Sequence, residues 1–184
     1  MLPPHRIREL LRELDDPAHL RVPARYDVPA AHRRFARLTD ALERRFGRSV
    51  TAGGVQDASL YGYVSVPAPA TATDRPLWVL MSNFGPLVTT GRGTGWGVPG
   101  CEEGLDAAFV TWLDELCTEL GCVYVPAELL LEPYDGPSRL EDDWEEDDWE
   151  EGGEEDEETE GDENGQDEGA ALPLAWWDRY FQFM

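Results

Sequence analysis

The sequence predicts an α+β fold with two N-terminal helices, an antiparallel sheet of about four strands, a helix packed on that sheet and an aromatic C-terminal helix. Two observations predict it. Apolar residues recur at helical spacing in the first 47 residues and again in residues 104–120, whereas residues 50–90 carry the alternating or continuous apolar runs of strands. A chain of 184 residues is expected to form one domain, and it is long enough to bury a core.

Two helices are expected before residue 47. The first has apolar residues at positions 7, 10, 11 and 14, and it stops at Asp15-Asp16-Pro17. The second follows Pro29, and Gly47 supplies its C-terminal stop. Its apolar face comprises Ala31, Phe35, Leu38, Leu42 and Phe46. Its other faces carry Arg33, Arg34, Arg37, Arg44 and Arg45. Three interpretations of these arginines stay open: a solvated face, a grip on phosphate, or a surface masked by acidic residues of the same chain.

The period changes to that of strands after residue 48. The expected strands are residues 50–51, 59–66, 77–81 and 87–90. Residues 82–86, SNFGP, have hairpin chemistry, because Asn and Gly tolerate a positive φ and Pro fixes φ. A glycine-rich loop, a helix, a short strand and a helical turn are expected to follow at residues 91–100, 104–120, 122–125 and 126–131.

An acidic segment then interrupts the fold. Residues 141–150 read EDDWEEDDWE, a tandem repeat of Glu-Asp-Asp-Trp-Glu, and 19 of the 28 residues in 141–168 are acidic. Such a segment cannot collapse against its own charge, so it is expected to be a disordered insertion within one domain formed by residues 1–140 and 169–184. Trp144 and Trp149 are unusual in a linker and are candidate contact residues. The aromatic run that ends the chain is expected to return to the core.

Charge and composition exclude several classes of protein. The net charge is −23, and residues 133–184 hold 21 acidic residues against 2 arginines. A block of this charge repels nucleic acid, so direct nucleic-acid binding is not expected. No window is apolar enough to cross a membrane and the N-terminus lacks a secretory signal, so a cytoplasmic protein is expected. The three cysteines form no CxxC pair, so no disulfide, metal site or cofactor is predicted.

No catalytic residue is predicted. The loop GRGTGWG lacks the Gly-Lys-Ser/Thr of a phosphate-binding loop and the GxGxxG spacing of a dinucleotide site, so a mobile loop with Trp96 exposed at its tip is favoured. The three histidines lie within the first 32 residues and are expected at the surface. Asp57 and Asn83 either form a polar rim at one end of the sheet or act as turn caps.

Four stretches together resemble small bacterial α+β immunity proteins encoded beside polymorphic toxins: VQDASLYGYVSV, LWVLMSNFGPLVTT, CVYVPAELLLEPYDG and WWDRYFQFM. The resemblance covers roughly Asp40 to Tyr134 and Ala175 to Met184, and the acidic insertion departs from it. It implies a non-enzymatic protein that binds and neutralises a cognate toxin in the cytosol, and it transfers no catalytic residue.

The resulting hypothesis is a protein-binding protein of the immunity type with a basic protein partner, since an acidic inhibitor gains association rate against the basic clefts of many toxins. Two alternatives stay open. In the first, the protein is an acidic regulator or nucleic-acid mimic that uses residues 141–168. In the second, it is a small ligand-binding domain or enzyme that uses residues 91–100.

Overall fold

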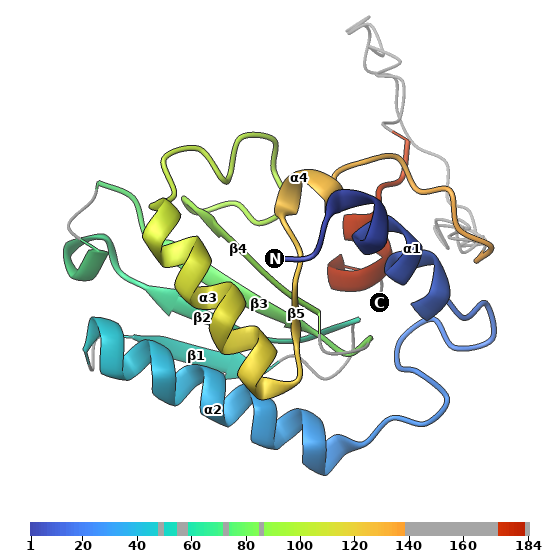
Figure 1. The fold of residues 1–184 in the computed structure, drawn as a ribbon, viewed down its shortest axis with the longest axis horizontal. Helices are drawn as coiled ribbons and strands as arrows, with labels where there is room; N and C mark the ends of the chain where they lie inside the picture. The colour runs from blue at the N-terminus through green and yellow to red at the C-terminus, as the bar shows by residue number, and fades with distance from the viewer. Residues whose placement is uncertain (48–49, 55–58, 72–73, 85–86, 139–172, 183–184) are drawn as a thin grey trace, which may run out of the picture.

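A five-stranded sheet with the strand order β1-β2-β3-β4-β5 forms the centre of the computed structural model, which describes residues 1–47, 50–54, 59–71, 74–84, 87–138 and 173–182 (Figure 1). The strands are β1 (Thr51–Gly54), β2 (Leu60–Val66), β3 (Leu77–Ser82), β4 (Leu87–Arg92) and β5 (Val123–Tyr124). The first four pair antiparallel with their neighbours in the chain. The α+β prediction is therefore confirmed.

The sheet differs from the prediction at its last strand. It has five strands instead of about four, and β5 pairs parallel to β4, with Leu87 opposite Val123. The reason is α3 (Ala107–Leu120), which lies between β4 and β5 in the chain. It returns the backbone to the end of the sheet at which β4 begins, so β5 runs in the same direction as β4. Such a crossover produces a parallel pair, whereas a tight turn produces an antiparallel one.

Helices cover both faces of the sheet (Figure 1). Because side chains alternate along a strand, β3 sends Leu77, Val79 and Met81 to one face and Trp78 and Leu80 to the other. The first face is covered by α2 (Val28–Phe46) and α3. The second is covered by α1 (Pro4–Leu14), the short α4 (Ala127–Leu130) and the C-terminal helical segment. A further 3₁₀ turn, η1 (Ala68–Thr71), lies in the proline-rich connection between β2 and β3.

Local sequence signals set the ends of α2. The Asp27 carboxylate caps its N-terminus by accepting a hydrogen bond from the Ala30 backbone N at 2.9 Å, and Pro29 occupies the first turn, where a missing N–H costs nothing. The helix ends at Gly47, whose φ of 90° suits glycine. Asp106 caps α3 in the same way through Ala108 N at 3.0 Å. The Asp27 cap thus fixes where the loop before α2 meets that helix.

The C-terminal aromatic segment packs on the core, but it is not a regular α-helix. Trp176 and Trp177 are α-helical, and Asp178–Gln182 form a π-helix, η2. Ala175 pairs with Pro133 in an isolated bridge just before it. The buried aromatic residues of this segment are Trp176, Trp177, Tyr180 and Phe181. They share a core with α1 and β3, so the residues on both sides of 139–172 pack together.

The predicted disordered insertion, residues 141–168, lies outside the described residues, together with Trp144 and Trp149. Asp57 also lies outside them. Among the helices in the described ranges, none is both long and apolar enough to cross a membrane.

Candidate protein-interaction surfaces

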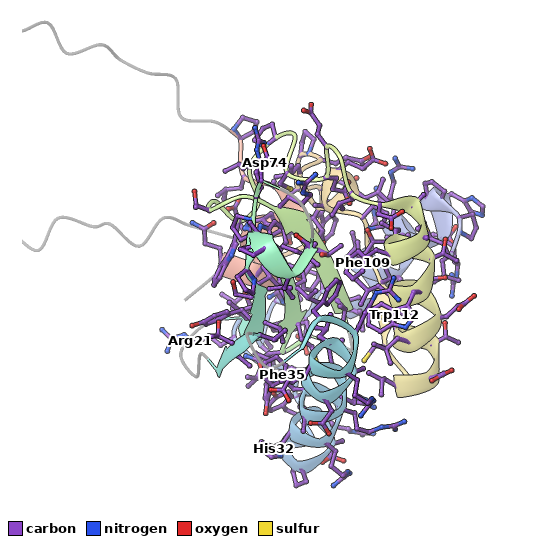
Figure 2. All side chains as sticks on the ribbon, turned by 90° about the vertical axis from the view of Figure 1, so that its left-hand side faces the viewer. Arg21, His32, Phe35, Asp74, Phe109 and Trp112 are labelled. Carbon is purple, nitrogen blue, oxygen red and sulfur yellow. The ribbon has the colours of Figure 1, made fainter. Side chains whose placement is uncertain are left out.

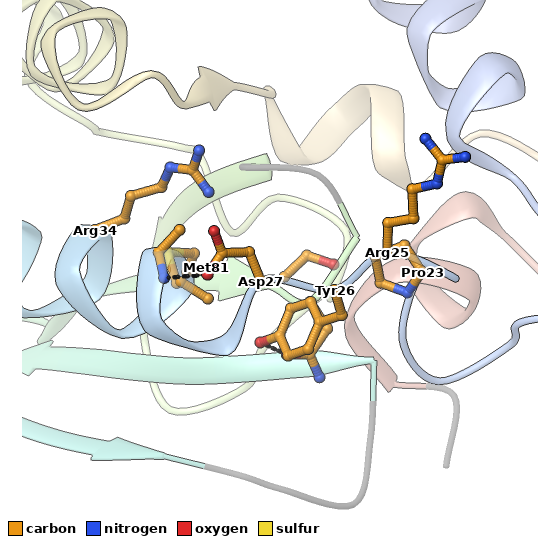
Figure 3. Close-up of a pocket in the computed structure, with 10 residues that line it drawn as sticks. Pro23, Arg25, Tyr26, Asp27, Arg34 and Met81 are labelled. Carbon is orange, nitrogen blue, oxygen red and sulfur yellow. Dashed lines mark hydrogen bonds between the residues drawn. The ribbon is translucent and has the colours of Figure 1, made fainter.

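A pocket of about 250 Å³ lies where the loop before α2 meets the end of β3 (Figure 3). Its apolar lining comes from Pro23, Tyr26, Ala30, Ala31 and Met81. Its polar lining comes from Arg25, Asp27, Arg34, Ser82 and Asn83. The pocket therefore combines an apolar interior with charged groups, a composition typical of binding sites.

Two side chains that are far apart in the chain hold the pocket wall together. The Tyr26 hydroxyl donates to Asn83 Oδ1 at 2.6 Å, and the Asn83 backbone N donates to the Ser59 carbonyl at 2.7 Å. Burial, with a smaller contribution from Tyr61, raises the pKa of Tyr26 to about 12, so its hydroxyl stays a neutral donor at physiological pH. The loop before α2 is thus tied to the end of β3.

Arginines continue from the pocket along α2. At about 3.6 residues per turn, Arg34 and Arg37 lie about 60° apart on one side of the helix, and Asp40 and Glu43 fall outside that arc. We call Arg25, Arg34 and Arg37 the basic surface. None of the three forms an ion pair with another described residue. Burial raises the pKa of Cys122 to about 11, and the positive charges of the nearby Arg34 and Arg37 oppose this rise.

Arg45, near the C-terminal end of α2, contacts aromatic side chains of α3. The Arg45 guanidinium lies 4.6 Å from the ring centre of Trp112 and 5.9 Å from that of Phe109, both on α3. Figure 2 labels these two rings on α3 beside α2. Arg45 is therefore engaged within the fold, whereas the basic surface near the pocket is available to a partner.

A second surface is formed by the glycine-rich loop after β4. Trp96 is 40% exposed, and its ring centre lies 5.1 Å from that of Tyr63 on β2. Val98 beside it is 45% exposed. Gly97, which follows Trp96 in the loop, lies directly over the buried Trp177 indole, where a Cβ would collide. The loop thus holds an exposed tryptophan against a fixed support.

Arg92 acts inside this loop instead of facing an anion. Its guanidinium donates to the Gly104 carbonyl at 2.7 Å and pairs with Asp74 at 3.3 Å. Its backbone N donates to the Cys101 carbonyl at 2.7 Å. Arg92 therefore ties the two ends of the loop together, which the sequence motif alone did not indicate.

The predicted site residues are thus distributed over separate places. Asn83 is buried and lines the pocket, whereas Trp96 is exposed on the second surface. Tyr26 and the position of Arg25 and Arg34 at one pocket were not anticipated, although the cluster of arginines at positions 33, 34 and 37 is visible in the sequence. Within the described residues, no three His, Cys, Asp or Glu side chains gather as a metal site would require.

The chain matches no protein-family model, no curated protein and no solved structure. The two surfaces therefore carry the functional argument.

Proposed function

We propose that this chain is a non-enzymatic protein-binding protein of the immunity type, which occludes a cognate bacterial toxin in the cytosol. The observation that carries the proposal is Trp96, a large aromatic side chain that is exposed and yet packed on Tyr63 at 5.1 Å between ring centres. Trp, Tyr and Arg are the residues that most often dominate protein interfaces.

The support beneath Trp96 favours this role. An interface side chain that is already held in one orientation loses little conformational entropy on binding, which leaves more of its contact energy as affinity. The Tyr63 ring, on strand β2, packs against the Trp96 ring, and the loop lies close against the Trp177 indole at Gly97. The exposed Val98 extends the apolar area beside it.

The charge of the chain supports a basic partner for this function. The described residues include 18 acidic and 13 basic side chains, a net charge of −5, and the whole chain has a net charge of −23. A partner with a basic active-site cleft is attracted by this field, which accelerates association more than it tightens the final complex.

The gene adjacent to the one that encodes this chain supplies the test. We expect its product, or the C-terminal domain of that product, to stop bacterial growth when expressed alone and to be neutralised when this chain is coexpressed. Isothermal titration calorimetry of the two purified proteins then measures the affinity. Trp96→Ala should weaken binding at least about tenfold, as expected for an interface hot spot.

Leu2→Ala is the matched control, because Leu2 is 39% exposed, close to the 40% of Trp96, but lies at the N-terminus. It should leave the affinity within about twofold. Deletion of residues 141–168 separates the two modes of binding: neutralisation that survives the deletion assigns the contact to the folded surface. An adjacent product that is not toxic, or full neutralisation by a Trp96→Ala variant of unchanged affinity, would refute the proposal.

A further inference from the structure

We infer that the pocket before α2 and the basic surface beside it form a docking site for an acidic segment of another protein, which inserts one large apolar side chain into the pocket. This site is separate from Trp96, and the inference does not depend on the proposed neutralisation of a toxin. Its occupant is defined by chemistry: carboxylates next to an aromatic or branched aliphatic side chain.

The size and lining of the pocket indicate a single side chain. Its volume of about 250 Å³ is below the roughly 300–1,000 Å³ of sites for drug-sized ligands. Tyr26, Ala30 and Met81 supply an apolar interior. Interface anchors are typically aromatic side chains in pockets of this kind, surrounded by contacts that exclude water.

The charges at the rim select an acidic partner. Arg25 and Arg34 line the pocket on two sides of Asp27 and Tyr26 (Figure 3). Arg37 follows Arg34 one turn along α2, and none of these three arginines has an ion-pair partner among the described residues. Guanidinium groups bind carboxylates with paired hydrogen bonds, so a segment with carboxylates on both sides of its apolar side chain matches this spacing of charge.

A peptide fits this surface better than a nucleic acid does. The Asp27 carboxylate lines the pocket and can accept a hydrogen bond from a peptide N–H, a donor that the sugar-phosphate backbone of a nucleic acid lacks. The described residues have a net charge of −5 in spite of the basic surface, from 18 acidic and 13 basic side chains, so the long-range field opposes a long polyanion such as a nucleic acid. A short acidic segment needs only the local field of three arginines.

The pocket is held in a binding-ready shape. Tyr26 is bound to Asn83, as described above, and the loop that leads to the pocket is anchored at its start, because Arg179 donates to the Leu20 carbonyl at 2.7 Å. The side chain of Arg179 is itself fully buried. Both anchors reduce the ordering cost of binding.

The test uses the full chain and a defined probe. The probe is the synthetic, end-capped peptide EDDWEEDDWE, labelled for fluorescence anisotropy, and it has eight carboxylates and two tryptophans. A second peptide replaces both tryptophans with glycine, and a third probe is a ten-nucleotide oligothymidylate. We expect the tryptophan peptide to bind at least about tenfold more tightly than the glycine peptide, as for an anchor side chain.

Three variants locate the site. Arg34→Glu should weaken binding of the tryptophan peptide at least about tenfold, whereas Arg44→Glu, with the same charge change about 15 Å away along the helix, should weaken it less than about threefold. Ala30→Leu fills the pocket and should abolish the preference for the tryptophan peptide over the glycine peptide. Thermal unfolding of each variant checks that the fold is retained.

Several results would overturn the inference. Equal affinity for the two peptides, or equal losses in Arg34→Glu and Arg44→Glu, would mean diffuse attraction without a docking site. Tighter binding of the oligonucleotide, sensitive to Arg34→Glu, would assign the surface to nucleic acid. In a full-length variant with Trp144→Gly and Trp149→Gly, peptide affinity at least about tenfold above that of the unaltered chain would show that the chain's own segment is the occupant. No binding to either chain would also refute the inference.

Discussion

The Asp15 carboxylate lies 2.6 Å from Nε of Arg179, and both side chains are fully buried although 164 residues separate them in the chain. Asp15 also accepts hydrogen bonds from the Ser138 hydroxyl at 2.5 Å and from the Tyr134 hydroxyl. The Arg179 guanidinium lies 4.2 Å from the ring centre of Phe84. One buried network thus joins the end of α1 to the two stretches of chain that flank residues 139–172.

Replacing one partner of this pair should be strongly destabilising. Arg179→Met keeps much of the apolar volume but leaves the Asp15 carboxylate buried without its cation. Removal of one partner of a buried pair costs about 3–5 kcal/mol, so we expect a decrease of this size in the free energy of unfolding measured with urea. Arg6→Met is the control, because the Arg6–Glu9 pair is exposed, and exposed pairs contribute little to stability. Similar losses in the two variants would contradict the structural role of Arg179.

The same network predicts how stability changes in acid. Burial raises the pKa of Asp15, but the hydrogen bonds from Ser138, Tyr134 and Arg179 outweigh it, so the pKa is lowered overall. A carboxyl group whose pKa is lower in the folded state stabilises the fold above its unfolded pKa, about 3.9 for Asp, and loses that contribution as the pH falls through the folded pKa. The free energy of unfolding should therefore decrease as the pH falls below about 4.

Asp15→Asn provides the comparison for the acid measurement. The asparagine does not titrate, so the variant should be less stable at neutral pH and should lose less stability than the unaltered chain as the pH falls. Other carboxyl groups with lowered pKa values, such as Glu132 beside Arg8, remain in both proteins and give a common background. Parallel stability curves for the two proteins would exclude Asp15 as a source of the acid sensitivity.

The elements were predictable because their signals are local. Pro29 and Gly47 mark the ends of α2 in the sequence, and the apolar steps of four and three residues between them identify its buried face. The buried run of β3 and the alternation of β2 are visible in the same way. The π-helix at the C-terminus was not predictable, because its hydrogen bonds depend on how the aromatic side chains pack, and the spacing of apolar residues does not specify them.

The pocket was not predictable because its parts meet only in the folded chain. Tyr26 and Asn83 are 57 residues apart in sequence, and each taken alone fits an ordinary loop or turn position. Asn83 was a candidate for its turn chemistry, whereas its contact with Tyr26 depends on how the loop before α2 packs on the end of β3. Trp96 could be named from the sequence because glycines on both sides of a tryptophan are typical of a loop.

Gly97 and Gly121 allow a matched test of the loop that supports Trp96. Their φ angles are 65° and 67°, so an alanine meets the same backbone cost of about 1–2 kcal/mol at either position. They differ in surroundings: a Cβ at Gly97 would collide with the Trp177 indole, and a Cβ at Gly121 has nothing within 4 Å. Gly97→Ala should therefore reduce the free energy of unfolding by about 1–3 kcal/mol more than Gly121→Ala does. Equal losses would show that Gly97 does not rest on Trp177.

The three cysteines predict how slowly the folded chain reacts with thiol reagents. Burial raises the pKa of Cys101 and of Cys122 to about 11 and also raises that of Cys117, so the reactive thiolate is scarce at about pH 8. All three side chains are buried as well. With an aromatic disulfide reagent we expect no rapid reaction of the folded chain and three equivalents after unfolding in guanidinium chloride, since the chain has 3 cysteines. Cys117→Ala should lower the second value to two equivalents while leaving the folded chain unreactive. A thiol that reacts in the folded chain as fast as free cysteine would contradict the burial of that cysteine in the structure.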